Sequence, residues 1–210
     1  EVGHALGEET AANRVNVLLG PGLNVKRSPL CGRSFEYFSE DPYLSGKMAA
    51  AYVRGIQENG IAACPKHFAV NSQELRRMAS NSVLDERTLR ELYLTAFEIV
   101  VKEAHPKSIM SAYNKVNDIY ANENHHLLVD ILRNEWGFEG AVVTDWGGSN
   151  DHVEGVKNGS TLEMPSPGLG GARKLLKAVA EGSLTEQEID LRVDELLELV
   201  LSTTAAMEKA

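Results

Sequence analysis

The sequence has few cysteines, few aromatic residues, no excess of positive charge and no long apolar run. The two cysteines, Cys31 and Cys64, are too few for a disulfide framework. We expect buried free thiols, although a single bridge stays open. Lys and Arg total 21 against 30 Asp and Glu. The net charge of −9 argues against nucleic-acid binding through a basic surface. No run is long enough to span a membrane, so no membrane partner is expected, and no feature indicates a compartment.

The sequence also has no metal-ligand spacing. None of the six histidines is spaced as a ligand, and the neighbours His125 and His126 would point apart on a helix. We therefore expect no metal and no cofactor. With 43% apolar and 24% charged residues, the composition is that of an ordinary globular protein. Neutral or mildly cationic small molecules stay open as ligands.

An apolar strand followed by a carboxylate and a large aromatic is the most informative motif. Residues 140–148 read Gly-Ala-Val-Val-Thr-Asp-Trp-Gly-Gly, which places Asp145 and Trp146 at the start of a glycine-rich loop. A carboxylate held rigidly at a strand end beside a stackable ring suits a nucleophile acting on a sugar. Aspartate also ends strands and caps helices for structural reasons, so this motif alone does not establish catalysis.

Helical and strand-like segments alternate along the chain. Strands are predicted for residues 15–19, 61–64, 108–112 and 140–144, with a short one ending at 162–165. Helices are predicted for residues 2–13, 42–59, from 85 onward, 124–136, 150–158 and up to residue 201. Asp41-Pro42 and the capping box Thr185-x-x-Glu188 mark two helix starts. This alternation predicts an α/β fold with a parallel sheet.

Polar residues follow all five predicted strands. They are Arg33 after the first strand, Lys66 and His67 after the second, Tyr113 and Asn114 after the third, Asp145 and Trp146 after the fourth, and Glu163 after the fifth. Because the carboxyl ends of parallel strands meet at one edge, these residues are predicted to form one site.

Four of these segments resemble motifs of glycoside hydrolase family 3. Residues 27–42 resemble the arginine-bearing loop of that family, and Lys66-His67-Phe68 resembles its Lys-His sugar clamp. Residues 110–114 (Met-Ser-Ala-Tyr-Asn) resemble its tyrosine strand, and residues 143–146 (Val-Thr-Asp-Trp) its nucleophile strand. The resemblance extends from about residue 8 to residue 201 with the motifs in family order.

The resemblance implies a retaining β-glucosidase-like enzyme with a TIM-like (β/α) barrel. Asp145 would attack the anomeric carbon and form a glycosyl-enzyme ester, while a second carboxyl group protonates the leaving oxygen. The cations of Arg33 and Lys66 would help keep Asp145 charged. Together with His67 they would also bind sugar hydroxyls.

The remaining predicted site residues surround these groups. Tyr113 would lie beside the nucleophile, and Trp146 would form an apolar wall at the leaving group. Glu163 is predicted equally well as a site residue or as a structural one.

Lys66 and His67 pose a geometric problem because neighbours on a regular strand point to opposite faces. Both can reach one sugar only if the backbone is irregular. We therefore predict a cis peptide or a bulge between Lys66 and Phe68.

The resemblance also implies parts that residues 1–210 lack. In the family, an upstream strand begins the barrel, and a C-terminal α/β sandwich domain supplies the acid/base carboxylate. We therefore expect residues 1–201 to form an incomplete barrel that carries the nucleophile, followed by a tail at 202–210. The expected partners are a β-glycoside substrate, the missing N-terminal segment and the missing C-terminal domain. Exposed sheet edges leave a homo-oligomer open as well.

Two other functions stay open at this stage. Lys66 at a strand end could form a Schiff base, as in an aldolase-like lyase. Alternatively, the chain could bind sugar without catalysis. The individual residues also have structural interpretations: Arg33 could pair with Glu36 or Glu40 and order its loop, and His67 could be a core histidine.

Overall fold

The computed structural model describes the backbone of residues 1–207 and the side chains of residues 1–203. The helical elements are α1 (Val2–Ala12), α2 (Pro42–Gln57), α3 (Glu86–Thr88), η1 (Leu89–Leu94), α4 (Thr95–Ala104), η2 (Ala121–Glu123), η3 (His126–Glu135), α5 (His152–Lys157), α6 (Leu169–Glu181) and α7 (Glu186–Met207). The strands are β1 (Val17–Leu18), β2 (Ala62–Ala63), β3 (Lys66–Phe68), β4 (Asn81–Ser82), β5 (Ser108–Ser111), β6 (Lys115–Val116), β7 (Ile119–Tyr120) and β8 (Ala141–Val143). The α/β class predicted from the sequence is confirmed.

The predicted strands pair side by side in chain order, and each pairing is parallel. β1 pairs with β2, and a bridge between Gly22 and Lys66 continues this pairing into β3. β5 lies between β3 and β8. The fifth predicted strand forms a single bridge, from Val143 to Leu162. The strands are shorter than predicted, but their carboxyl ends meet at one edge as the sequence indicated.

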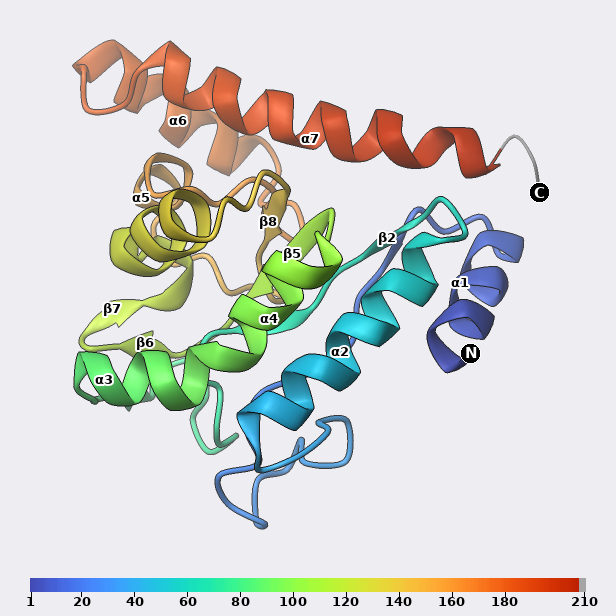
Figure 1. Cartoon of the computed structure of the whole chain (residues 1–210). Coiled ribbons are helices and arrows are strands. Elements are labelled where there is room, and N and C mark those ends of the chain that lie inside the picture. Colours follow the sequence, from blue (N-terminus) through green and yellow to red (C-terminus); the bar gives the residue numbers. More distant parts are fainter. Residues whose placement is uncertain (208–210) are drawn as a thin grey trace.

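Helices α2 and α4 lie side by side across the sheet, and α1 packs beside α2 (Figure 1). The main core fills the space between these helices, η3 and the strands. Phe68 of β3 forms edge-to-face contacts with Phe97 at 5.2 Å and with Trp136 at 6.0 Å between ring centroids. This packing fixes the backbone from which Lys66 and His67 project.

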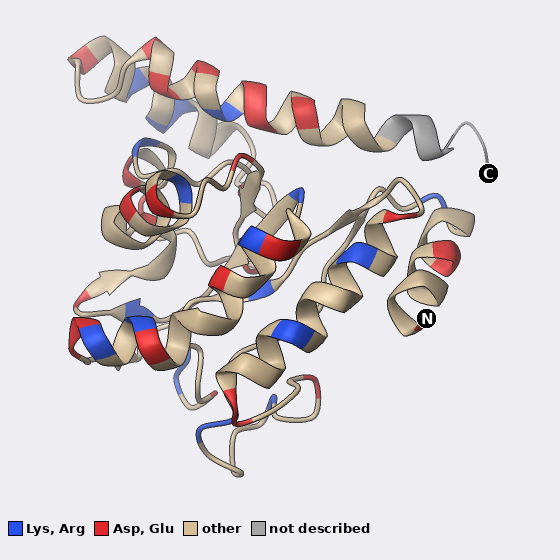
Figure 2. Ribbon diagram, in the orientation of Figure 1, with Lys and Arg blue, Asp and Glu red and all other residues tan. Residues whose placement is uncertain are grey.

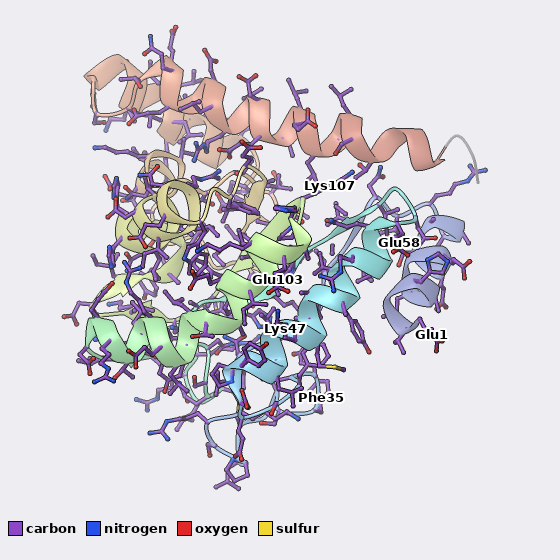
Figure 3. All side chains as sticks on the ribbon, viewed as in Figure 1. Glu1, Phe35, Lys47, Glu58, Glu103 and Lys107 are labelled. Carbon is purple, nitrogen blue, oxygen red and sulfur yellow. The ribbon has the colours of Figure 1, made fainter. Side chains whose placement is uncertain are left out.

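Close approach of α2 and α4 depends on a glycine. A Cβ at Gly46 would lie 2.8 Å from Ile99 Cδ1, so a larger residue would push the helices apart. Outside this contact, Lys47 of α2 forms an ion pair with Glu103 of α4, and both are labelled in Figure 3. The predicted Asp41 cap begins α2, because its Oδ1 accepts the N–H groups of Tyr43 (2.7 Å) and Leu44 (3.1 Å).

A second, three-stranded sheet was not predicted. β4 pairs with β6 in parallel and β6 pairs with β7 antiparallel. Each of these strands has two residues, which is too short for hydrophobic periodicity to identify. The loop before β4, residues 69–80, lies beside the predicted site and becomes important below.

Helix α7 crosses one end of the fold, and acidic residues lie along much of its length (Figures 1 and 2). Its capping box forms as predicted: Glu188 N donates to Thr185 Oγ1 at 3.2 Å, and Thr185 N donates to Glu188 Oε2 at 2.7 Å. The helix runs to Met207, past the end at residue 201 that the sequence indicated, so the first part of the predicted tail, residues 202–207, continues the helix. Residues 208–210 of the predicted tail lie outside the described residues.

Candidate active site

Asp145 lies two residues past the end of the fully buried strand β8. Backbone hydrogen bonds of Asp145 and of its neighbours in the chain fix its position. Thr144 N donates to Leu162 O at 3.0 Å, and Gly148 N donates to Asp145 O at 2.8 Å across a turn that uses a positive φ of 77° at Gly147. The carboxylate is 8% exposed, and its Oδ1 accepts the backbone N–H of Trp146 at 2.8 Å. The other oxygen, Oδ2, faces the residues that follow the first and second predicted strands.

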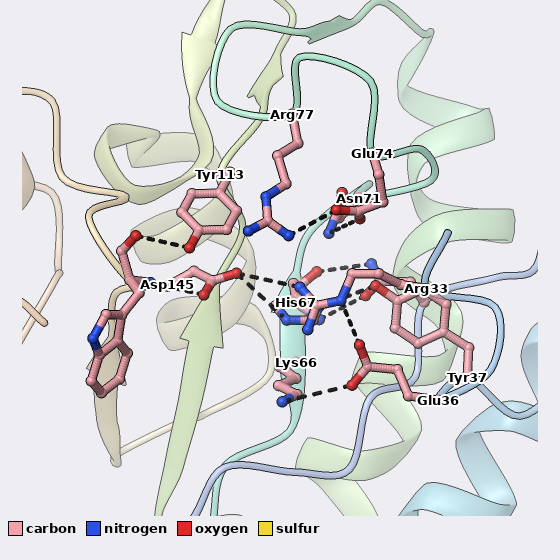
Figure 4. A network of polar contacts seen from close by, with 12 residues as sticks. Arg33, Glu36, Tyr37, Lys66, His67, Asn71, Glu74, Arg77, Tyr113 and Asp145 are labelled. Carbon is pink, nitrogen blue, oxygen red and sulfur yellow. Dashed lines mark hydrogen bonds and ion pairs between the residues drawn. The ribbon is translucent and has the colours of Figure 1, made fainter. Parts of the chain in front are cut away.

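Two nitrogen atoms approach Asp145 Oδ2 (Figure 4). His67 Nε2 lies at 3.5 Å and Arg33 Nη1 at 3.7 Å. Neither distance is that of a good hydrogen bond, and Oδ2 has no hydrogen-bond partner among the described residues. The carboxylate therefore has one oxygen held by the backbone and one oxygen that points into a positively charged surrounding.

Glu36 connects the two cations of the site. Its Oε1 accepts a hydrogen bond from Arg33 Nε, and its Oε2 lies 3.7 Å from Lys66 Nζ. All three side chains are largely buried, with 17–20% exposed. The pairing of Arg33 with Glu36, expected as a structural role, is present together with the approach of Arg33 to Asp145. Arg33 therefore both orders its loop and faces the carboxylate.

His67 is fully buried and is held by Asn24 and Tyr37. Asn24 Oδ1 accepts the His67 N–H at 2.7 Å, and Asn24 Nδ2 donates to His67 O at 2.9 Å. Tyr37 Oη lies 3.1 Å from Nδ1. Burial, together with the nearby charges of Arg33 and Lys66, lowers the pKa of His67 to about 2, so the ring is neutral at physiological pH.

The predicted irregularity at Lys66 is confirmed. The Lys66–His67 and Phe68–Ala69 peptide bonds are cis, and the pairing with β5 shifts register between Lys66 and Phe68. As a result both neighbouring side chains contact the site: Lys66 approaches Glu36, and His67 approaches Asp145.

Tyr113 and Trp146 lie on the other side of Asp145. Tyr113 Oη donates to Trp146 O at 2.8 Å, and burial, followed by the charge of Asp145, raises the pKa of this phenol. The Arg77 guanidinium lies over the Tyr113 ring at 4.5 Å and donates to Glu74 Oε2 at 2.8 Å. The Trp146 side chain is 48% exposed, which is consistent with a wall of the site rather than a core residue.

Glu163 is not joined to this network by any contact between described residues. Its Oε2 lies 2.6 Å from His152 Nδ1, at the start of α5. Its role in the site remains a prediction, and this contact with His152 favours the structural interpretation.

Several residues of the site were not found from the sequence. They are Asn24, Tyr37, Asn71, Glu74 and Arg77. Glu36, three residues from Arg33, was expected only as a structural partner of that arginine. The others lie in loops, where no periodicity indicates which side chains turn toward Asp145.

Three further features concern the rest of the described residues. No group of three or more His, Cys, Asp or Glu in the described residues is arranged to hold a metal ion. No helix within the described part of the chain is long and apolar enough to cross a membrane. Both cysteines are free thiols, Cys64 buried and Cys31 partly exposed, and burial raises the pKa of Cys64 to about 12.

Comparison with known proteins identifies the family. The model of the glycosyl hydrolase family 3 N-terminal domain matches residues 1–199. The chain therefore belongs to glycosyl hydrolase family 3.

The similar proteins described next are named beta-glucosidase or arabinopyranosidase. Thermostable beta-glucosidase B of Acetivibrio thermocellus is 52% identical over 199 residues, covering 95% of this chain and 26% of that protein. An exo-alpha-(1->6)-L-arabinopyranosidase of Bifidobacterium breve is 44% identical over 207 residues, covering 99% and 27%. The solved structure of beta-glucosidase 3B from Thermotoga neapolitana in complex with glucose is 44% identical, with a TM-score of 0.95 over 99% of this chain and 30% of that one. The chain thus spans about a quarter of the length of these curated relatives.

Proposed function

We propose that the chain is the nucleophile-bearing domain of a retaining β-glycosidase that acts on terminal β-D-glucosyl residues. One observation carries the proposal: Asp145 has one oxygen anchored by the Trp146 N–H, while Oδ2 has no hydrogen-bond partner among the described residues and faces Arg33 and His67. An anchored carboxylate with one unbonded oxygen is suited to attack carbon, because the attacking oxygen need not first break a hydrogen bond. Relatives named beta-glucosidase support the choice of glucosides.

In the proposed reaction, Asp145 Oδ2 bonds to the anomeric carbon as the bond from that carbon to the leaving oxygen breaks. The leaving oxygen takes a proton from a general acid, and water later cleaves the glycosyl ester. Arg33 and Lys66 donate hydrogen bonds to sugar hydroxyls from the buried side of the site. Neutral His67 can do the same through its Nε2–H.

The proton donor is proposed to come from another part of the enzyme. The two other carboxylates of the network are each engaged with cations: Glu36 with Arg33 and Lys66, and Glu74 with Arg77. A carboxylate whose oxygens are held by cations is poorly placed to reach the leaving oxygen and protonate it. The chain spans about a quarter of the length of its relatives, which leaves room for such a part.

The same reasoning extends to the fold. We propose that the five parallel segments are consecutive strands of a (β/α) barrel, in which residues 1–201 form one portion. The parallel order of the strands and the gathering of polar residues at their carboxyl ends support this arrangement. The Schiff-base alternative has no support, since Lys66 pairs with Glu36 instead of occupying the apolar pocket that activates an amine.

The test is a mass spectrum after incubation with a 2-deoxy-2-fluoro-β-D-glucoside that has an activated leaving group. The activated leaving group of such a reagent departs without being protonated, so labelling reports on the nucleophile alone. We expect one glycosyl adduct on the peptide that contains Asp145, and no adduct in Asp145→Asn. An adduct elsewhere, or none in the folded chain, would refute the proposed role of Asp145.

A further inference from the structure

The site has two chemically different sides. Its buried side holds the charged and polar groups Arg33, Glu36, Lys66 and His67. Its solvent side is bordered by the half-exposed Trp146 and by the loop of residues 71–80. This loop contributes Arg77 and Glu74 above Tyr113 (Figure 4).

The loop is held in place by its own hydrogen bonds and by its neighbours. Ala79 N and Ser80 N both donate to Arg76 O, at 2.8 and 2.9 Å. Lys115 N donates to Ser80 O at 2.8 Å, which ties the loop to β6. The contact of Arg77 with the Tyr113 ring adds a link to the site itself. A side chain on this loop therefore has a defined position relative to Asp145.

Met78 is the loop residue that reaches the turn after the nucleophile. A Cβ on Gly147 would lie 3.9 Å from Met78 Cε, so the methyl group packs against the turn that follows Trp146. Even so, Met78 is 51% exposed, and Trp146 is 48% exposed. A flexible thioether and an indole therefore lie near the same turn, and each is about half exposed among the described residues.

We propose that Met78, together with Trp146, binds the leaving group of the substrate and selects aromatic leaving groups. The inference rests on the function proposed above. In a double displacement the leaving group departs from the sugar face opposite the nucleophile. With the hydroxyls bound by Arg33, Lys66 and His67 on the buried side, the leaving group extends toward the apolar solvent side. A thioether is polarisable and adapts its shape, and sulfur packs favourably against aromatic rings.

Two reagents with the same sugar but different leaving groups distinguish binding of the aromatic leaving group by Met78 from a role of Met78 in supporting the site as a whole. The chain is incubated with 2-deoxy-2-fluoro-β-D-glucosyl fluoride, or with the 2,4-dinitrophenyl glycoside of the same sugar, and the rate of adduct formation is followed by mass spectrometry. In Met78→Ala we expect labelling by the dinitrophenyl reagent to slow about fivefold, the loss of one sulfur–aromatic contact. Labelling by the fluoride, which has no ring, should change by less than about twofold.

Met48 provides a matched control. It is 44% exposed on α2, outside the site, and Met48→Ala should leave both rates unchanged. Equal slowing by both reagents in Met78→Ala would overturn the inference, because Met78 would then support the site as a whole. An unchanged dinitrophenyl rate would overturn it as well. If neither reagent labels the unmodified chain, the proposed function fails first and the inference with it.

A binding measurement gives a readout without turnover. In a chain with ¹³C-methyl methionine, the Met78 signal is identified by its loss in Met78→Leu. A phenyl 1-thio-β-D-glucoside should shift this signal through the ring current, whereas the methyl 1-thioglucoside should not. A shift of equal size with both ligands would contradict contact between Met78 and the aromatic group.

Discussion

Replacing Asn24 with alanine should destabilise the fold strongly, because Asn24 is the partner of both backbone groups of His67. Asn24 is 3% exposed and His67 fully buried. The mutation leaves the His67 N–H, now bonded at 2.7 Å, and the His67 C=O, bonded at 2.9 Å, without these partners. A buried backbone group left unpaired costs about 1–3 kcal/mol, so two of them predict a loss of about 2–6 kcal/mol in the free energy of unfolding.

Equilibrium urea denaturation measures this loss. The midpoint should fall while the slope of free energy against urea stays constant, since the area exposed on unfolding is nearly the same. Asn13→Ala is the control: Asn13 donates to Glu9 O at 2.8 Å but is exposed, so the change should be below about 0.5 kcal/mol. A loss below about 1 kcal/mol for Asn24→Ala, or a changed slope, would refute the reasoning. The variant should also lose labelling at Asp145, because His67 would no longer be fixed beside it.

Three further predictions concern charges. Glu36→Gln keeps a hydrogen-bond acceptor for Arg33 but removes the negative charge beside Lys66. It should slow labelling of Asp145 about tenfold in the mass-spectrometric assay. An unchanged rate would argue against Glu36 as a positioning residue. Because the pKa of His67 falls from 6.5 to about 2 on folding, the unfolded state binds the proton first, and stability is lost as pH falls below about 6.5, by about 1.4 kcal/mol per pH unit. The difference in unfolding free energy between the unmodified chain and His67→Gln should therefore shrink by about 2 kcal/mol between roughly pH 7.5 and 5. A constant difference would mean that His67 takes up a proton in the folded state as readily as in the unfolded state, and would refute the lowered pKa. Arg133→Ala removes a largely buried side chain that pairs with Glu195 of α7 (2.9 Å) and donates to Gly159 O (2.9 Å). Because Arg192 still pairs with Glu195, the free energy of unfolding should fall by about 2 kcal/mol in urea titrations, whereas the exposed Arg173→Ala should change it by less than about 0.5 kcal/mol.

The sequence was informative where a residue's position follows from chain periodicity. The run before Asp145 is apolar and bounded by glycines, so both the strand and the place of the carboxylate at its end could be predicted. The adjacency of Lys66 and His67 even predicted irregular backbone, because two neighbours on one strand cannot otherwise face the same site.

Prediction failed where the position depends on tertiary packing. Arg77 reaches Tyr113 from a loop before β4, and Asn24 reaches His67 from the loop after β1. Both partners are more than 30 residues away in the sequence, and neither loop has a pattern that reveals them. The shortness of β4, β6 and β7 hid the second sheet for a related reason, since two residues carry no period.

The proton on His67 connects these unpredicted contacts to the chemistry. A neutral imidazole has one N–H, and the phenol of Tyr37, 3.1 Å from Nδ1, has a hydrogen to donate. If Tyr37 donates to Nδ1, then Nε2 carries the ring hydrogen and presents it to Asp145 Oδ2 at 3.5 Å. The opposite tautomer would place a lone pair against a carboxylate oxygen in a buried site, which is repulsive. Tyr37 therefore favours the tautomer whose Nε2–H attracts Oδ2. At 3.5 Å this N–H is too distant for a full hydrogen bond, so in the proposed reaction the oxygen is available to attack carbon.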